Sequence, residues 1–330
     1  YCDRLAVMKD GEIVETGRAE TVFAMPRHPY TARLVDATPR PGAGLRALLP
    51  PDARTPLAAH AIKETPLLQA RGLTKTYAGK SGPVHAVRGI DFTIRTGQSV
   101  GLVGESGCGK STTSEMLVRL LDPTAGDILF DGQEIGAIPA DRFVRDPRRG
   151  AIQMVFQDAT DSLNPRHTAR AAIAEPLRRL RRMTRAARQA RVDELASLTG
   201  LPLPLLARFP HQLSGGQKAR VGIARAIALD PKFLILDEPT AALDVSIQAI
   251  VLNLLADLRA RLGMSYLFVS HDLNVVRLLC DHVIVMKVGR IVEECPTARV
   301  MTAPAQPYTR ALLAAAPHPP AAAPQMQVAE

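Results

Sequence analysis

Long apolar runs are missing from this chain of 330 residues. A helix that crosses a bilayer needs about 18 or more consecutive apolar residues, and the nearest stretches are interrupted by Arg225, Asp230 and Asp257. We therefore expect any role at a membrane to be peripheral. The chain opens at Tyr1 without the charged leader and apolar segment of a signal peptide, and we interpret this start as a cut end.

Cysteine is scarce. Cys2, Cys108, Cys280 and Cys295 are scattered without a Cys-x-x-Cys pair, and the eight histidines do not pair with them at the spacing of metal ligands. Reduced thiols in a cytoplasmic protein are the simplest interpretation.

Lysine is scarce too, since only eight of the 41 basic residues are lysines, and arginines concentrate in residues 142–149 and 178–191. The formal net charge of +9 raises the question of nucleic acid, but basic motifs interleaved with aromatic residues, typical of that class of protein, are lacking. We expect no nucleic-acid partner. A solvated arginine-rich helix face explains the charge, and attraction to anionic lipid head groups is the better alternative.

The first forty residues are repeated near the C-terminus without a slip in register. The matching residues are Cys2, Asp3, Val7, Met8, Lys9, Gly11, Ile13, Val14, Glu15, Pro29, Tyr30, Thr31 and Leu34 in the first copy and Cys280, Asp281, Val285, Met286, Lys287, Gly289, Ile291, Val292, Glu293, Pro307, Tyr308, Thr309 and Leu312 in the second. We predict that residues 1–40 are the end of an upstream copy of the same domain, and that the natural protein is a tandem.

The rest of the chain divides by composition. Residues 41–66 are rich in Pro, Ala and Gly and lack periodicity, which predicts a linker. Short β-favouring runs at residues 90–94, 99–103, 152–156, 233–236 and 266–269 alternate with helical stretches, which predicts an α/β core. Strand signals vanish over residues 168–228, where we expect a helical subdomain. The Ala- and Pro-rich tail after Pro317 has too little apolar bulk to pack and is expected to be disordered.

A glycine-rich segment follows the predicted strand at residues 99–103, precedes a helical stretch and fits G-x-x-x-x-G-K-[ST]. Glycines let backbone N–H groups wrap a phosphate, and the helix N-terminus favours negative charge. Lys110 is expected to neutralise the β- and γ-phosphates and Ser111 to ligate Mg²⁺; the alternative is a glycine-rich turn without nucleotide. The segment predicts ATP and Mg²⁺ as cofactors, bound by Gly104, Glu105, Ser106, Gly107, Cys108, Gly109, Lys110, Ser111 and Thr112. Because a helix N-terminus can lower the pKa of a thiol, we also expect Cys108 to be reactive and protected by nucleotide.

Two acids end the apolar run that begins at Phe233. Asp237 closes the run, in the form of a buried strand that delivers a carboxylate to the metal, and Glu238 follows. A carboxylate at that position can orient the water that attacks the γ-phosphate, or accept its proton. The pattern is weak by itself, but the phosphate loop strengthens it.

A third segment indicates the family. Residues 213–217, Leu-Ser-Gly-Gly-Gln, stand upstream of the strand with the two acids and resemble the LSGGQ signature of ATP-binding cassette proteins. Ser214, Gly215, Gly216 and Gln217 can present donors at the start of a helix to a phosphate; alone, the run would be interpreted as a helix cap. In the family, that phosphate belongs to ATP held by a partner domain.

The resemblance covers residues 67–293 and implies further roles. Tyr77 is similar to the aromatic residue that stacks on adenine, and Gln157 to the glutamine that contacts Mg²⁺ or water and links the site to the helical subdomain. Leu243 and Asp244 resemble the loop that faces the opposite subunit, and His271 the histidine that contacts the γ-phosphate. The implied fold is a P-loop NTPase with a RecA-like core, an antiparallel β subdomain and a helical subdomain of about residues 158–228, within a nucleotide-binding domain of residues 67–298.

The subfamily rests on shorter matches. Residues 161–165 and 307–310, and residues 28–31 in the first copy, resemble ATPases of dipeptide, oligopeptide and nickel importers. Residues 299–330 are then the C-terminal extension of that type. Departures are Ala159 for a frequent proline, Lys218 and Ala219 for Arg and Gln after the signature, and Cys295 for the glycine seen at Gly17. None removes a catalytic group.

The resemblance implies partners and a location. We expect a head-to-tail dimer with a second cassette, since the phosphate loop and the signature serve different ATP molecules, and transmembrane permease subunits, with a solute-binding protein acting indirectly. The expected location is the cytoplasmic face of the cell membrane, and the expected solutes are peptides, nickel complexes or glutathione. The alternatives are a cassette ATPase that acts on ribosomes or nucleic acid, and a truncated cassette that binds ATP without hydrolysing it.

Overall fold

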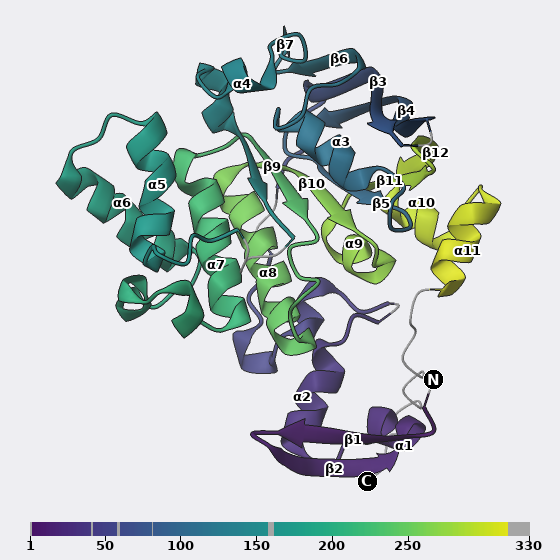
Figure 1. Ribbon diagram of the computed structural model, residues 1–330. Helices are drawn as coiled ribbons and strands as arrows, with labels where there is room; N and C mark the ends of the chain where they lie inside the picture. Colours follow the sequence, from purple (N-terminus) through teal and green to yellow (C-terminus); the bar gives the residue numbers. More distant parts are fainter. Residues whose placement is uncertain (1, 41, 58–59, 81, 158–161, 316–330) are drawn as a thin grey trace.

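Two larger β-sheets organise the molecule (Figure 1). The computed structural model describes residues 2–40, 42–57, 60–80, 82–157 and 162–315. The core sheet runs in the order β12-β11-β5-β10-β9-β8, with all neighbours parallel except β11 and β12. Its strands are β5 (Ser99–Val103), β8 (Ile152–Val155), β9 (Phe233–Asp237), β10 (Ser265–Ser270), β11 (His282–Lys287) and β12 (Arg290–Pro296).

The core sheet is buried on both faces, which explains why its central strands are continuous apolar runs. On β9, Leu234 and Leu236 pack with the helices on one face, and Phe233 and Ile235 with the second sheet and its helix on the other. The first face is covered by α7 (Gly215–Ala226), α8 (Val245–Leu262) and α9 (Leu273–Leu279), and the second by α3 (Lys110–Leu117). Four of the five runs predicted as strands lie wholly within strands, and the fifth, residues 152–156, extends one residue past the end of β8.

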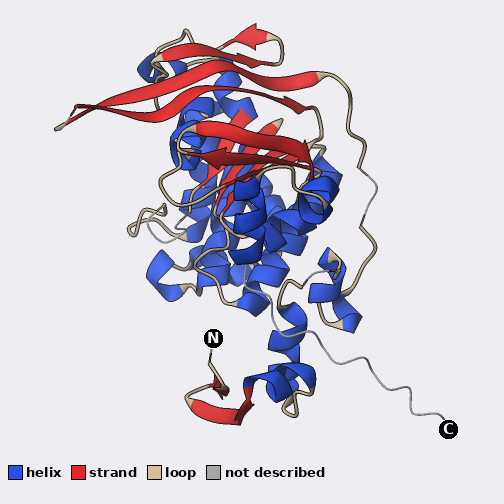
Figure 2. Ribbon diagram, turned by 90° about the vertical axis from the view of Figure 1, so that its right-hand side faces the viewer, coloured by secondary structure: helices blue, strands red, loops and turns tan. Residues whose placement is uncertain are grey.

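The second sheet is antiparallel, in the order β4-β3-β6-β7. Its strands are β3 (Pro66–Gly79), β4 (Gly82–Arg95), β6 (Ala125–Phe130) and β7 (Gln133–Glu134), followed by α4 (Ala140–Phe143) and a 3₁₀ turn, Pro147–Ala151. Figure 2 shows this sheet at one end of the molecule. It supplies the second layer against which β5 and α3 are buried.

Helices fill the region between β8 and β9. They are α5 (Ala169–Leu180), α6 (Arg185–Leu198) and α7, with 3₁₀ turns at Leu203–Ala207, Pro210–Gln212 and Ile227–Leu229. Thr168 and Thr184 cap α5 and α6 by accepting backbone N–H hydrogen bonds at their first turns. The described part of residues 162–228 holds no strand, as predicted. Residues 158–161, at the start of this predicted subdomain, lie outside the described residues.

The two copies of the repeat have the same element order. The first holds β1 (Arg4–Lys9), β2 (Glu12–Arg18), α1 (Ala19–Ala24) and α2 (Pro29–Ala37), and the second β11, β12, α10 (Thr297–Thr302) and α11 (Pro307–Ala315). The second hairpin belongs to the core sheet, whereas the first forms a separate two-stranded sheet at the opposite end from the antiparallel sheet (Figure 2). The tail that was expected to be disordered, residues 316–330, lies outside the described residues.

Part of the segment predicted as a linker, residues 45–49, packs against the rest of the molecule. The first of its two 3₁₀ turns, Leu45–Leu48, buries Leu45 and Leu48, whereas the residues of the second, Pro51–Ala53, are exposed. Arg46 forms an ion pair with Asp257 and donates to Asn253, both on α8, and Asn253 Nδ2 donates to the Leu45 carbonyl at 3.1 Å. Apolar side chains and one guanidinium therefore hold residues 45–48 on α8.

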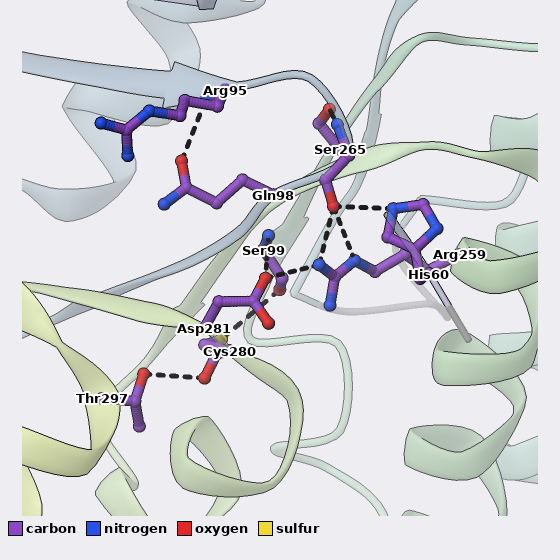
Figure 3. Close-up of polar contacts among 10 residues, drawn as sticks. His60, Arg95, Gln98, Ser99, Arg259, Ser265, Cys280, Asp281 and Thr297 are labelled. Carbon is purple, nitrogen blue, oxygen red and sulfur yellow. Dashed lines mark hydrogen bonds and ion pairs between the residues drawn. The ribbon is translucent and has the colours of Figure 1, made fainter. Parts of the chain in front are cut away.

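A second anchor of this segment lies before β3. His60 Nε2 lies 2.8 Å from the carbonyl oxygen of Gly97, which also accepts from Arg259 Nη2 at 2.7 Å. Figure 3 shows both side chains pointing toward this position, with Asp281 paired to Arg259. Asp281 also accepts from the backbone N–H of Ser99 at 2.9 Å. The turn that precedes β5 is thus joined to the segment, to α8 and to the start of β11.

No helix among the described residues is both long and apolar enough to cross a bilayer.

Candidate active site

The phosphate loop lies between β5 and α3, at the edge of the core sheet where its parallel strands end. Ligands of open α/β sheets bind at this edge because loops from several strands meet there. A cavity of about 500 Å³ opens beside the loop. It is lined by Ala86, Ser106, Gly107, Gly109, Lys110, Ser111, Thr112, Gln157, Glu238 and His271.

The glycines of the loop are required by its backbone. Gly107 has φ 80° and Gly109 has φ 107°, a region that other residues rarely adopt. A Cβ atom at Gly109 would also lie 2.4 Å from the carbonyl oxygen of Ala86. Space and torsion angle therefore both exclude a larger residue at Gly109, because β4 lies directly against the loop.

Lys110 is the cation of the cavity. Its side chain is buried, and Nζ donates to the carbonyl oxygens of Gly104 at 2.7 Å and Glu105 at 2.9 Å. Ser111 and Thr112 follow in the first turn of α3 and also line the cavity. Together with the positive end of the helix dipole, Lys110 makes this wall of the cavity suited to an anion.

Asp237 is the buried acid of the site. Burial raises its pKa to about 6, the charge of Glu238 adds to this, and a hydrogen bond from Ser111 opposes it. Within the described residues its Oδ1 atom is buried and has no hydrogen-bond partner. Mg²⁺ takes oxygen ligands and commonly uses one or two carboxylates together with phosphate oxygens, so the unpartnered carboxylate oxygen beside a hydroxyl fits Mg²⁺. Among the described residues, no group of three or more His, Cys, Asp or Glu offers a rival metal site.

Three strands deliver the side chains that surround Glu238. Gln157, after β8, donates from Nε2 to Glu238 Oε2 at 3.2 Å, and His271, after β10, places Nδ1 3.2 Å from Glu238 Oε1. Glu238 itself follows β9 with φ 44°, a left-handed conformation that costs energy for a residue with a side chain. Its N–H donates to the carbonyl of Val269 at 3.0 Å. The two oxygens of this carboxylate are thus held from both sides at the mouth of the phosphate loop.

The signature residues and Asp244 lie outside the cavity lining. Ser214 caps α7 in a reciprocal pair with Gln217, whose Oε1 accepts from the Ser214 N–H at 3.0 Å. A Cβ atom at Gly216 would lie 2.5 Å from Ile247 on α8, so this glycine lets α7 approach α8. Asp244 caps α8 by accepting from Ile247 N–H at 3.0 Å. In one chain, these residues have local structural roles.

Tyr77 also lies outside the cavity lining. It is exposed on β3, with Lys75 Nζ 5.2 Å from its ring centroid. Ala86 on β4 lines the cavity, and the sequence offered no signal for it. Tyr308 contacts the phosphate loop through a hydrogen bond from the Glu105 N–H at 3.1 Å; its only signal in the sequence was the repeat and the subfamily match.

The expectation that the helix N-terminus lowers the pKa of the Cys108 thiol is wrong. Only 5% of the residue is exposed, and burial raises the pKa of its thiol. Lys110, with Nζ 3.9 Å from Sγ, lowers the pKa but does not outweigh burial. The sequence placed Cys108 near a helix N-terminus, whereas the fold turns its side chain into the core.

Family models match two parts of the chain. A model described as "ABC transporter" matches residues 87–241, and one described as "Oligopeptide/dipeptide transporter, C-terminal region" matches residues 14–65 and 292–329. The second model thus matches near both ends of the chain, around the two copies of the repeat.

Curated relatives and solved structures agree with these matches. The glutathione import ATP-binding proteins GsiA of Salmonella paratyphi A and of Escherichia coli are each 42% identical over 96% of this chain. The chain spans about half of their length, 53%.

Among solved structures, the dimeric ATP-binding cassette MJ0796 bound to ADP and Pi is 31% identical, with a TM-score of 0.65 over 70% of this chain and 99% of that one. CbiO1 of Clostridium perfringens, part of the ABC transporter complex cbiONQ, is 32% identical, with a TM-score of 0.64 over 73% of this chain and 92% of that one. Both share the fold, which confirms the predicted fold class.

Proposed function

This chain belongs to the ATP-binding cassette family of transporter ATPases, and from that premise we propose that it binds and hydrolyses Mg·ATP to power a membrane importer. The observation that carries the proposal is the convergence of three strand ends on Glu238 at the mouth of the phosphate loop. Gln157 and His271 hold its two carboxylate oxygens, and Lys110 lies in the same cavity. An anion site beside a positioned carboxylate is the minimum that phosphoanhydride hydrolysis requires.

Each polar side chain at the site has a separate role in the proposed reaction. Lys110 and the N–H groups of the loop bind the β- and γ-phosphates. Asp237, Ser111 and Gln157 would hold Mg²⁺, which when bound offsets the negative charge of the phosphate oxygens. Glu238 orients the attacking water and accepts its proton, and His271 keeps the Glu238 carboxylate directed into the cavity.

The position of the signature supports a shared site. Ser214 and Gln217 lie outside the lining of the cavity that holds Lys110, so one chain does not close the site around a phosphate. MJ0796 is dimeric with ADP and Pi bound, and we propose the same head-to-tail arrangement here, with Ser214 facing the ATP of a second cassette and Asp244 and Tyr77 near that interface. ATP then joins the two cassettes, and hydrolysis releases them.

Domain organisation follows from the repeat and from the half-length coverage of the relatives. We propose that residues 1–40 complete an upstream cassette, residues 41–66 connect it to the nucleotide-binding domain of residues 67–298, and residues 299–330 form the C-terminal extension. The upstream cassette is then the natural dimer partner, with permease subunits at the cytoplasmic face of the membrane. The relatives named for glutathione import support small peptides as the solute class, and no observation favours ribosome or nucleic-acid binding.

Mixing two inactive variants tests the shared site. Lys110→Ala removes the phosphate-binding cation, and Ser214→Arg blocks the signature, so each variant alone should be nearly inactive in a phosphate-release assay. An equimolar mixture should recover roughly a quarter of the parental turnover, because half of the randomly formed dimers are mixed and each keeps one native site. Parental turnover per chain should also rise with protein concentration.

Two outcomes would contradict the proposal. Turnover that is first order in protein where only monomer is detected, with no recovery on mixing, excludes the shared site. A parent chain that does not bind Mg·ATP in an equilibrium titration excludes the ATPase function altogether.

A further inference from the structure

The second copy of the repeat forms a wall against the phosphate loop. The N–H of Gly289 donates to the carbonyl of Cys108 at 2.9 Å, and a Cβ atom at Gly104 would lie 2.3 Å from the carbonyl oxygen of Met286. From α11, the hydroxyl of Tyr308 accepts the hydrogen bond of the Glu105 N–H at 3.1 Å. Both the hairpin β11–β12 and the C-terminal helix therefore touch the backbone that is to hold phosphate.

Tyr308 is held in place from several sides. The carboxylate of Glu293, on β12, accepts from the N–H groups of Ala305 at 2.8 Å and Gln306 at 3.1 Å, just before α11 begins. Lys287 Nζ lies 4.6 Å from the centroid of the Tyr308 ring, within the range of a cation–π contact. Burial raises the pKa of the Tyr308 hydroxyl, which keeps it neutral at physiological pH.

We propose that Tyr308 is a positioning residue for the phosphate loop, through which the C-terminal helix α11 supports nucleotide binding. Glu105 connects the two residues, because its N–H donates to the Tyr308 hydroxyl and its carbonyl oxygen accepts from Lys110 Nζ. When the ammonium of Lys110 turns toward a bound phosphate, its hydrogen bonds to the loop carbonyls weaken, and Lys110 restrains Glu105 less. The Glu105 carbonyl still accepts from the Cys108 N–H at 3.3 Å within the loop, and the Tyr308 hydroxyl restrains Glu105 from outside the loop. Loss of the Tyr308 hydrogen bond should therefore weaken affinity more than turnover. This inference rests on the proposed ATP site.

The first copy provides a matched control within the same chain. Tyr30 lies at the corresponding place on α2, with Lys9 Nζ 5.7 Å from its ring centroid. Glu15 accepts from the N–H groups of Arg27 and His28 before α2, as Glu293 does before α11. The sequence, however, holds a single phosphate-loop motif, at residues 104–111. Tyr30→Phe therefore removes the same atom from a closely similar local setting that has no phosphate loop of its own.

The experiment compares the parent chain with Tyr308→Phe and Tyr30→Phe. Equilibrium titration with a fluorescent ATP analogue in Mg²⁺ measures affinity, and phosphate release at saturating ATP measures turnover. We expect Tyr308→Phe to weaken affinity by roughly 3- to 10-fold, the size of one hydrogen bond, with turnover at saturation nearly unchanged. Tyr30→Phe should match the parent in both.

Hydrogen exchange of peptides covering residues 104–109 and 307–315 separates positioning from mere helix docking. In Tyr308→Phe we expect faster exchange in the loop with α11 still protected. Equal affinity and exchange in the two variants would overturn the proposal. Loss of protection throughout α11 would also overturn it, because the tyrosine would then only anchor the helix. A parent that binds no ATP would instead refute the proposed function, which keeps the two failures distinguishable.

Discussion

The hairpins β1–β2 and β11–β12 are nearly the same local structure in two different surroundings. Both are antiparallel, and the pairing register shifts at the same place, between Val7 and Met8 in one and between Val285 and Met286 in the other. Both turns use two successive residues with positive φ, of which the second is glycine. The shared residues of the repeat thus determine the hairpin, including its bulge, without help from neighbouring strands.

Burial separates the two hairpins. Met8 and Ile13 are each 61% exposed, whereas Met286 is fully buried and Ile291 packs against the core. The reason is that β11 pairs with β5 and lies against the phosphate loop, while β1 pairs with β2 and with no other strand in the described part of the chain. Local sequence therefore sets the conformation of each copy, but the presence of a cassette core decides whether its apolar face is covered. Four predictions test this contrast.

The largest expected effect is on ATP turnover. This activity requires the cassette that contains the second copy of the repeat. Glu238→Gln keeps the shape of the side chain but cannot accept a proton. We expect turnover to fall by at least roughly a hundredfold while Mg·ATP affinity is retained. Single-turnover phosphate release and a nucleotide titration measure the two quantities. Parental turnover in the variant would mean that Glu238 is not the base.

The matched methionines test burial directly. Met286→Ala removes a fully buried side chain and should lower the free energy of unfolding by about 3 kcal/mol, within the range for large-to-small core substitutions. Met8→Ala, at an exposed position, should change it by less than about 0.5 kcal/mol. Urea denaturation of both variants measures the difference. Equal losses in the free energy of unfolding would mean that the apolar face of the first hairpin is also buried.

Replacing Asp237 tests how much its buried carboxylate lowers the free energy of unfolding of the chain. Its pKa of about 6 lies above the usual value for Asp, so folding disfavours the charged form; the penalty is fully developed above pH 6 and shrinks as the pH falls toward 4. The shift corresponds to at most about 3 kcal/mol, and we expect Asp237→Asn to stabilise the nucleotide-free chain by about 2 kcal/mol at pH 8 and by about half as much at pH 5.

Thermal unfolding at the two pH values measures this gain. Mg²⁺-dependent nucleotide affinity should be lost in the same variant, and in the parent it should weaken below pH 6, where Asp237 becomes protonated. A gain in stability that does not vary with pH would exclude the titration of Asp237 as its cause.

The smallest effect is a difference in labelling between matched cysteines. Cys2 is exposed, whereas Cys280 is buried and its pKa is raised to about 12 by burial. A thiol reagent at pH 8 should label Cys2 at once and Cys280 only after denaturation, and Cys108 should behave like Cys280. Mass spectrometry of the labelled peptides locates the adducts. Rapid labelling of Cys280 in the folded chain would contradict its place in the core.

Local sequence patterns were sufficient to predict much of the secondary structure and the phosphate loop. The central strands were predictable because a parallel strand buried on both faces is a continuous apolar run, and the helical region because its apolar residues recur at helical spacing. The phosphate loop was predictable because close wrapping of a phosphate admits few residues other than glycine. The order of these segments resembles that of ATP-binding cassette proteins and so indicated the family. The repeat indicated two equivalent hairpins.

Only the tertiary structure decided which distant residues meet. Gln157, Glu238 and His271 come from three strands, and parallel pairing brings their ends to one edge. The same holds for Tyr308, which reaches the phosphate loop because β11 pairs with β5, and for residues 45–48, whose leucines and Arg46 found partners on α8. Tertiary packing likewise decided the thiol of Cys108, because burial raises its pKa more than nearby positive charge lowers it. Contacts between residues far apart in the sequence depend on the packing of the whole chain, so no local pattern could specify them.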